Sequence, residues 1–228
     1  FANLRYNLRY FTLFGVFMSC SLSAVKICAK IAGRELFRDF SLSLAHKQKL
    51  ALLAPNGRGK STLLMILAGL LPASSGQIFI FDDEIKSLKD FEKHRSKIGF
   101  LFQDSNEQFV RASVLDDVGF GLLSFELCAS KEQANTKALK MLESLGISHL
   151  KDKICFHLSG GEKKLVALAG VLITEPKIVF LDEPTAGLDE SSSARLAEIL
   201  GSIDASMLIA SHDKDFVSKI TSNIYKLE

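Results

Sequence analysis

The sequence predicts an α/β protein built around a largely parallel sheet, and three features indicate this class. Short apolar segments alternate along the chain with segments of helical periodicity. A glycine-rich loop stands between one such apolar segment and the helix that follows it. The chain has 228 residues, 47% of them hydrophobic and 24% charged, which is enough for one large domain or two small ones.

The first predicted strand covers residues 50–53, a short apolar run that leads into the glycine-rich loop. A helix is expected over residues 61–71, because Gly69 and Pro72 stop the pattern there. Residues 77–81 are the next expected strand. These elements have the strand, loop and helix order in which α/β proteins place their ligands.

Most of residues 115–157 is predicted to be helical. Ser130 with Gln133 matches a capping box, and the helix that it starts is expected to end at Gly146. The apolar face of that helix consists of Ala134, Ala138, Leu142 and Leu145. After it, we expect a helix at about 162–174, a buried strand at 178–181, a helix around 192–200 and a strand at 207–210.

The N-terminal segment needs separate treatment. Residues 10–25 are uncharged and follow Arg5 and Arg9, but the stretch is too short for a membrane span. Its basic start and small-residue end imitate a secretory signal, which the rest of the chain argues against. The chain opens with Phe1, and Met18 stands just ahead of the first segment that resembles folded protein. We therefore expect residues 1–17 to be an upstream or non-native extension and residues 18–228 to be one domain.

Charge weakens the case for a general nucleic-acid binder, and the spacing of possible metal ligands argues against a zinc site. With 28 Lys and Arg against 26 Asp and Glu, the net charge is +2, and no basic cluster supports nucleic-acid binding. The four cysteines and five histidines show no zinc-ligand spacing. These residues are Cys20, Cys28, Cys128, Cys155, His46, His94, His149, His157 and His212.

The glycine-rich loop at residues 54–62 has the composition of a phosphate-binding loop. Its glycines let backbone N–H groups converge on phosphates at a helix N-terminus, while Lys60 reaches the β- and γ-phosphates and Ser61 binds Mg²⁺. The expected nucleotide contacts are Asn56, Gly57, Arg58, Gly59, Lys60, Ser61 and Thr62. Ala54 replaces the usual first glycine, which would cost about 1 kcal/mol if that position needs positive φ and almost nothing otherwise. The alternative is an ordinary glycine-rich turn.

Two adjacent carboxylates end the buried strand predicted at 178–181. At the carboxyl end of a strand, Asp182 can help hold Mg²⁺ while Glu183 polarises the water that attacks the γ-phosphate. Neighbouring strand residues point to opposite sides, which suits different tasks. A solvated acidic pair is the alternative for this motif taken alone.

A second glycine-rich helix start lies at residues 158–162. It contains Ser159, Gly160, Gly161 and Glu162, and it precedes a helix whose Leu165, Leu168, Ala169 and Leu172 share a face. One chain has a single phosphate loop to fill. A second amide nest is therefore explained best if it serves a nucleotide held by another copy. Alone, the segment could be a flexible turn.

Together these motifs resemble the ABC-type ATPases. The match also includes Gln103 after a short strand, L-D-E-P-T at 181–185, G-L-D at 187–189 and Ser211-His212-Asp213, and it runs in order from about residue 25 to the end. The resemblance implies a P-loop NTPase fold of the ABC-ATPase type, with a mostly parallel sheet core, an antiparallel β edge and a helical subdomain at about 104–160. It also implies a peripheral protein on the cytoplasmic face of the membrane.

The resemblance further implies roles for single residues. In this family two ATP molecules, with Mg²⁺, lie between the phosphate loop of one subunit and Ser159 to Glu162 of the other, in a head-to-tail dimer that we expect to be a homodimer. Gln103 touches Mg²⁺ and senses the transport partner, Asp189 couples the two sites, and His212 contacts the γ-phosphate.

A finer resemblance indicates the transport system. Residues 102–109 and 160–164 are similar to the ATPases of energy-coupling-factor importers, which work with a membrane scaffold and a substrate-binding membrane component. Residues 104–109 with 169–172 are more similar to the cobalt and nickel group, and vitamin uptake is the alternative. A nucleotide-binding regulatory module with weak catalysis, and an ATPase that acts on nucleic acid, are the rival functions.

Two departures from the family pattern bear on activity. Residues 27–33 contain no Tyr or Phe where an aromatic side chain usually stacks on adenine, so we expect weaker ATP binding, by roughly 1 to 3 kcal/mol. Leu165 stands where such signatures commonly carry Arg, which makes the helix start less basic.

Overall fold

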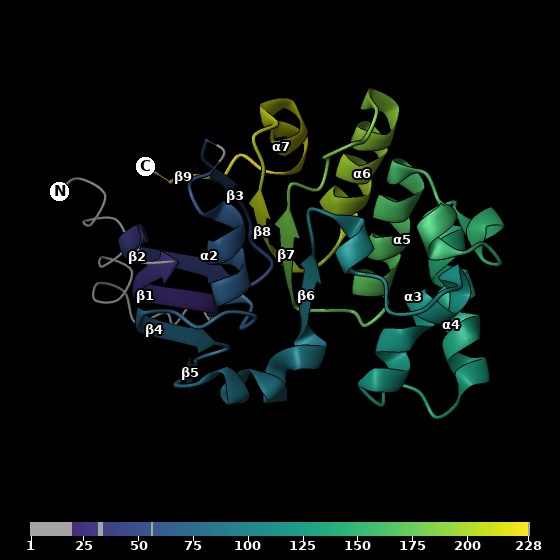
Figure 1. The fold of residues 1–228 in the computed structure, drawn as a ribbon, viewed down its shortest axis with the longest axis horizontal. Helices are drawn as coiled ribbons and strands as arrows, with labels where there is room; N and C mark the ends of the chain where they lie inside the picture. Colours follow the sequence, from purple (N-terminus) through teal and green to yellow (C-terminus); the bar gives the residue numbers. More distant parts are fainter. Residues whose placement is uncertain (1–19, 32–33, 56, 228) are drawn as a thin grey trace.

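The computed structural model describes residues 20–31, 34–55 and 57–227. The extension expected at 1–17 and the expected nucleotide contact Asn56 lie outside these ranges. Across the molecule, an antiparallel sheet stands at one end, a parallel sheet in the middle and a group of helices at the other end (Figure 1).

The central sheet has five strands, and its neighbouring strands all run parallel. In sheet order they are β6 (Ile98–Leu101), β7 (Ile178–Asp182), β8 (Ser206–Ala210), β3 (Lys49–Leu53) and β9 (Ile224–Lys226). Every residue of β7 and β8 is buried, as expected for central strands of a parallel sheet with both faces covered. The strands predicted at 50–53, 178–181 and 207–210 are confirmed.

Two hydrophobic cores lie on opposite faces of this sheet. Because side chains alternate along a strand, Val179 and Leu181 of β7 enter one core while Ile178 and Phe180 enter the other. The first core includes the apolar face of the helix that follows the second glycine-rich motif. The second joins the parallel sheet to the antiparallel one.

The antiparallel sheet orders its four strands as β2 (Arg34–Ala45), β1 (Cys20–Ile31), β4 (Ser75–Ile80) and β5 (Asp83–Ile85). The strand expected at 77–81 is thus β4, at the antiparallel end of the molecule. β1 and β2 pair with several register shifts, for example between Ala24 and Ile27. Such shifts interrupt the two-residue alternation that marks a strand in a sequence.

The helices cover both faces of the parallel sheet and fill the far end of the molecule (Figure 1). They are α2 (Lys60–Leu67), α3 (Val114–Ser124), α4 (Lys131–Ser144), α5 (Gly160–Leu172), α6 (Glu190–Ser202) and α7 (Lys214–Ile220), with a 3₁₀ segment at Leu88–Lys97. No helix within the described ranges is both long and apolar enough to cross a membrane.

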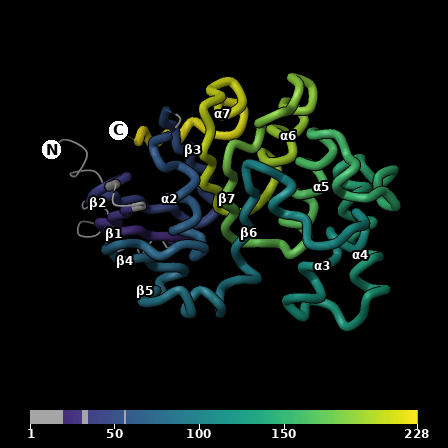
Figure 2. The backbone as a smooth tube through the Cα atoms, in the orientation of Figure 1, coloured from purple at the N-terminus to yellow at the C-terminus, as the bar shows by residue number. Residues whose placement is uncertain are grey.

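The region predicted to be mostly helical contains α3, α4 and short 3₁₀ turns at Ser148–Leu150 and Cys155–His157. The helix α4 begins where expected, because the Ser130 hydroxyl accepts the N–H of Gln133 at 3.3 Å. The Gln133 side chain, however, accepts from Ala129 N–H and not from Ser130. Gly146, with φ of +64°, follows the end of α4 as expected for a left-handed C′ residue. Figure 2 traces the path from β6 through these helices and back along α5 to β7.

Candidate nucleotide-binding site

The predicted phosphate loop connects β3 to α2, as its strand, loop and helix pattern requires. Gly57 and Gly59 have φ of +78° and +79°, a conformation that costs other residues energy. Ala54 is not among the described residues with positive φ, so its replacement of glycine carries no backbone penalty. Arg58 is exposed in the loop, and Thr62 is half-buried in the first turn of α2.

Three charged or polar side chains form a continuous chain beneath the loop. Lys60 Nζ donates to the Ala54 carbonyl at 2.8 Å and lies 3.2 Å from Glu183 Oε1. The other carboxylate oxygen, Glu183 Oε2, lies 2.8 Å from His212 Nδ1. The structure therefore joins the predicted phosphate lysine, catalytic carboxylate and histidine into one network.

Glu183 directly follows the last residue of β7 and has an unusual backbone conformation. Its φ is +42°, an unusual value for a residue with a side chain, and its N–H donates to the Ala210 carbonyl at 2.8 Å. Such conformations cluster at functional sites and cost about 1 to 3 kcal/mol. Asp182 is the last residue of β7 and Glu183 lies beyond it, so the two face different partners without the alternation within a strand that the sequence predicts.

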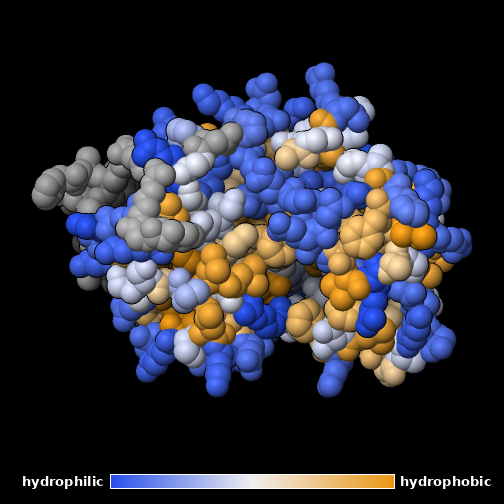
Figure 3. All heavy atoms as spheres, in the orientation of Figure 1, coloured by the Kyte–Doolittle hydropathy of each residue, from blue (hydrophilic) through white to orange (hydrophobic). Residues whose placement is uncertain are grey.

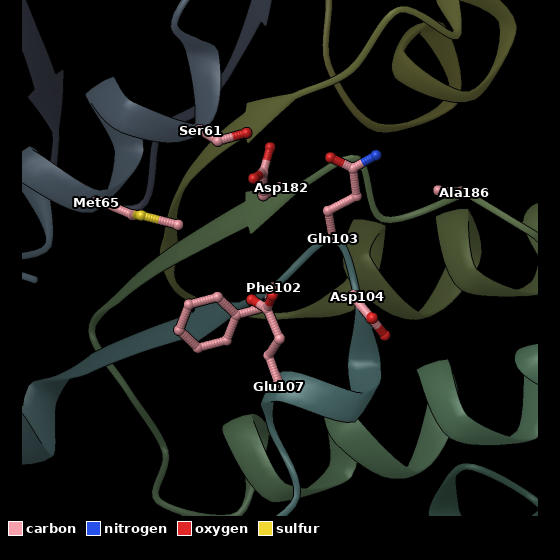
Figure 4. Close-up of a pocket in the computed structure, with 8 residues that line it drawn as sticks. All are labelled: Ser61, Met65, Phe102, Gln103, Asp104, Glu107, Asp182 and Ala186. Carbon is pink, nitrogen blue, oxygen red and sulfur yellow. The ribbon is translucent and has the colours of Figure 1, made fainter. Parts of the chain in front are cut away.

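A cavity of about 510 Å³ lies beside the loop. Ser61, Asp182 and Gln103 point into it from three different elements (Figure 4). Its remaining lining residues are Met65, Phe102, Asp104, Glu107 and Ala186. Burial raises the pKa of Asp182, while a hydrogen bond with Ser61 opposes that rise.

The donors in this cavity fit Mg²⁺. Asp182 Oδ1 is buried and has no hydrogen-bond partner among the described residues. Ser61 and Gln103 add neutral oxygens, and Mg²⁺ prefers oxygen ligands. The described part of the chain has no group of three or more His, Cys, Asp or Glu residues that could hold a metal alone. Magnesium in such sites takes its remaining ligands from water and substrate phosphates.

The second glycine-rich motif starts α5 with a complete capping box. The Ser159 hydroxyl accepts the Glu162 N–H, and the Glu162 carboxylate accepts the Ser159 N–H at 2.8 Å. These hydrogen bonds lower the pKa of Glu162. Gly160 and Gly161 lie next to the segment of Gly187 and Leu188, where an added Cβ would still find at least 3.5 Å of space.

This motif lines a second cavity of about 480 Å³, together with Asp189. Asp189 caps α6: its carboxylate accepts from the Ser191 hydroxyl and from the Ser192 hydroxyl and N–H, which lowers its pKa to about 2. The two cavities share no lining residue. The structure therefore gathers the predicted site residues into two separate groups.

The two departures from the expected pattern are visible in the structure. Leu165 is 7% exposed and joins the hydrophobic core, where an arginine would be buried. The aromatic residue near the loop is Phe37, whose ring lies 3.7 Å from where a Cβ of Gly59 would stand. Phe37 is 9% exposed and packs against Phe40, so it belongs to the core.

Sequence reasoning missed several residues at these sites. Lys164 is buried on α5 and donates to the backbone beside Gln103, and the motif gave no sign that this lysine points inward. Arg195 lines the second cavity and donates to the Leu145 carbonyl. Its position on α6 beside the end of α4 could not be inferred without the tertiary fold. Met65 lines the first cavity from the second turn of α2.

Comparison with known proteins gives one family. A family model described as ABC transporter matches residues 37–186. An uncharacterized ABC transporter ATP-binding protein from Haemophilus influenzae is 39% identical over 206 residues, which cover 90% of this chain and 94% of the relative.

Two further relatives carry more specific descriptions. An energy-coupling factor transporter ATP-binding protein from Methanosphaera stadtmanae is 35% identical over 196 residues, covering 84% of this chain and 70% of the relative. The structure of cbiO1 from Clostridium perfringens, described as part of the ABC transporter complex cbiONQ, is 35% identical with a TM-score of 0.78. That match covers 92% of this chain and 85% of cbiO1.

Proposed function

This chain belongs to the ABC transporter family of ATP-binding proteins and is an ATPase, and we propose that its ATP hydrolysis powers an energy-coupling-factor importer for cobalt or nickel. In this proposal ATP binding closes a dimer of two copies, and hydrolysis with product release reopens it. The similarity to an energy-coupling factor ATPase and to cbiO1 supports the importer class. The assignment of cobalt or nickel as the transported substrate rests on the similarity of residues 104–109 and 169–172 to the cobalt and nickel group.

The proposed dimer is inferred from the separation of the two cavities. Ser61, at the end of the phosphate loop, and Asp182 line the first, while Ser159, Gly160 and Gly161 line the second. A glycine-rich helix start that exposes N–H groups attracts anions, and one copy offers it no phosphate of its own. A second copy in head-to-tail orientation would bring each phosphate loop to the other copy's Ser159 motif.

The residues that line the first cavity and the Lys60–Glu183–His212 network beside it have distinct tasks in this mechanism. Lys60 and the loop N–H groups hold the phosphates, and Glu183 orients and polarises the attacking water. His212, whose Nδ1 lies 2.8 Å from Glu183 Oε2, would contact the γ-phosphate. Ser61, Asp182 and Gln103 would hold Mg²⁺, which when bound neutralises charge that develops on the phosphates.

We place the membrane contact on the segment that follows Gln103. The buried Asp117 carboxylate accepts both the Val110 and Arg111 N–H groups at 2.7 Å, so this backbone is fixed. Val110 is 61% exposed and Phe156 is 52% exposed. Figure 3 shows apolar patches near α2 and over the helical region, separated by hydrophilic surface. Such a firmly held apolar surface suits a helix of the membrane scaffold.

The proposal also gives the protein its place and partners: a peripheral subunit at the cytoplasmic face of the membrane, with a scaffold and a substrate-binding component, and no nucleic acid. The test is to isolate the intact membrane complex and to assay uptake of Co²⁺, Ni²⁺ and vitamins. Uptake of Co²⁺ or Ni²⁺ that fails with Glu183→Gln supports the proposal. Vitamin uptake alone would overturn the metal assignment, and equal ATPase rates for wild type and Glu183→Gln would overturn the catalytic one.

A further inference from the structure

A buried lysine connects the two cavities of one chain. Lys164 lies on α5, five residues after Ser159, and only 2% of its surface is exposed. Its Nζ donates to the Phe102 carbonyl at 3.1 Å and to the Gln103 carbonyl at 2.7 Å. The ammonium therefore holds the backbone of the loop whose side chains line the nucleotide cavity.

Packing alone does not account for a lysine at this position. Burial lowers the pKa of Lys164, and the charges of Asp182 and Asp104 only partly oppose that effect. A buried charge destabilises a fold relative to an apolar residue of similar volume unless its hydrogen bonds are made. Ala167 and Leu168, three and four residues further along α5 and therefore on the same face as Lys164, are buried and apolar, so a hydrophobic side chain would suit this face.

The distance along the helix is short. A helix rises about 1.5 Å per residue, so Ser159 and Lys164 are separated by about 7.5 Å along the axis of α5. Ser159 lines the second cavity and Gln103 lines the first. The Lys164 side chain is therefore a direct link between the start of α5 and the Gln103 backbone.

We propose that Lys164 is a positioning residue that couples the two ATP sites of a dimer. When Ser159 and Gly160 engage a nucleotide on the other copy, α5 moves as a unit, and Lys164 carries Gln103 toward the Mg²⁺ position of its own site. The inference rests on the proposed dimer. It assigns no chemical step to Lys164, which acts only through Gln103.

The test uses Lys164→Met, which keeps the volume of the side chain and removes the donor. In the wild type we expect cooperative ATP hydrolysis with a Hill coefficient well above 1, which falls to about 1 in Lys164→Met. In a Glu183→Gln background, the Mg²⁺ concentration for half-maximal binding of a fluorescent ATP analogue should rise about threefold or more. Lys164→Arg, which retains donors, should restore both values.

The control is Lys163→Met, which removes the same charge from the neighbouring position. Lys163 Nζ contacts the side chain of Asn106 at 2.9 Å and not the Gln103 backbone, so both readouts should keep their wild-type values. If Lys164→Met fails to fold, Lys164→Leu, which also lacks a donor, replaces it, and thermal unfolding separates lost stability from lost coupling. Unchanged cooperativity and Mg²⁺ dependence in folded Lys164→Met or Lys164→Leu would overturn the inference.

Gln103→Ala distinguishes failure of the inference from failure of the proposed function. If Gln103→Ala raises the Mg²⁺ requirement and the wild type is cooperative, but Lys164→Met changes nothing, only the role of Lys164 is wrong. If the wild type shows no cooperativity and no ATP-dependent dimer in sedimentation, the proposed dimer fails and this inference fails with it.

Discussion

The Nζ atom of Lys60 lies 3.2 Å from Oε1 of Glu183, and both side chains are only 6% exposed. The cation that would hold phosphates and the carboxylate that would polarise water thus form a buried ion pair. A buried carboxylate without such a partner would be strongly unfavourable. Nucleotide binding must therefore replace one partner of Lys60 by another.

This competition predicts the effect of Glu183→Gln on nucleotide affinity. The variant removes the ion pair but leaves Lys60 its hydrogen bond to the Ala54 carbonyl. A non-hydrolysable ATP analogue should therefore bind about three- to tenfold more tightly, which corresponds to about 1 kcal/mol, as measured by titration calorimetry. His212→Ala keeps the Lys60 pair and should give no gain. Equal affinities for wild type and Glu183→Gln would mean that the pair does not compete with phosphate.

Gly69 should tolerate no side chain. Its φ is +72°, and an added Cβ would stand 2.3 Å from Cγ of the buried Phe91. Gly69→Ala should lower the free energy of unfolding by about 2 to 4 kcal/mol, from backbone strain and the steric clash together. Gly201→Ala, on α6 with nothing within 4 Å of the new Cβ, is the matched control and should gain up to about 1 kcal/mol. Similar urea midpoints for the two variants would mean that Phe91 leaves room for a side chain at Gly69.

Restoring the usual glycine of the phosphate loop should bring no benefit. Ala54 does not have positive φ and is 9% exposed, so glycine relieves no strain there. Ala54→Gly should lower the free energy of unfolding by about 0.5 to 1 kcal/mol, because glycine loses more backbone entropy on folding. ATP turnover should stay at the wild-type rate. Higher thermal stability of the glycine variant would show that the alanine is strained after all.

The contribution of Asp189 to the stability of α6 should depend on pH. Hydrogen bonds from Ser191 and Ser192 hold its pKa at about 2 in the folded protein, against an ordinary value of 3.8. The stabilisation is present above pH 3.8 and is lost as pH falls toward 2. Asp189→Asn keeps a helix cap without the charge, so its deficit in unfolding free energy relative to wild type should shrink over that interval. A deficit that stays constant from pH 6 to pH 2.5 would show that the charge of Asp189 does not stabilise the helix.

The parts of the fold that the sequence predicts well have strong local signals. The buried run of β7 and the left-handed Gly146 after α4 depend on few neighbours, and both lie where expected. The long strands β1 and β2 could not be recognised, because their register shifts break the alternation of inward and outward residues. The start of α4 at Ser130 is predicted, but the end of α3 at Ser124 is not, because no glycine or proline marks it.

The candidate site shows the same division. Sequence motifs place Lys60, Asp182 and Glu183 on the right elements, and the fold brings them together. The ion pair between Lys60 and Glu183 depends on how α2 and β7 pack, which no spacing reveals. The role of Lys164 is hidden for a similar reason, because whether a helix residue faces the loop after β6 is decided by tertiary contacts.

The helices between β6 and α5 interrupt a simple strand, helix, strand unit, and their two ends meet. The Ala112 carbonyl accepts the Cys155 N–H at 2.8 Å, and Val114 N–H donates to the Lys153 carbonyl at 3.0 Å. A segment that departs from and returns to neighbouring points can be exchanged as a module without disturbing the sheet. Sequence changes within these helices can therefore accumulate while the sheet that carries the nucleotide site keeps its shape.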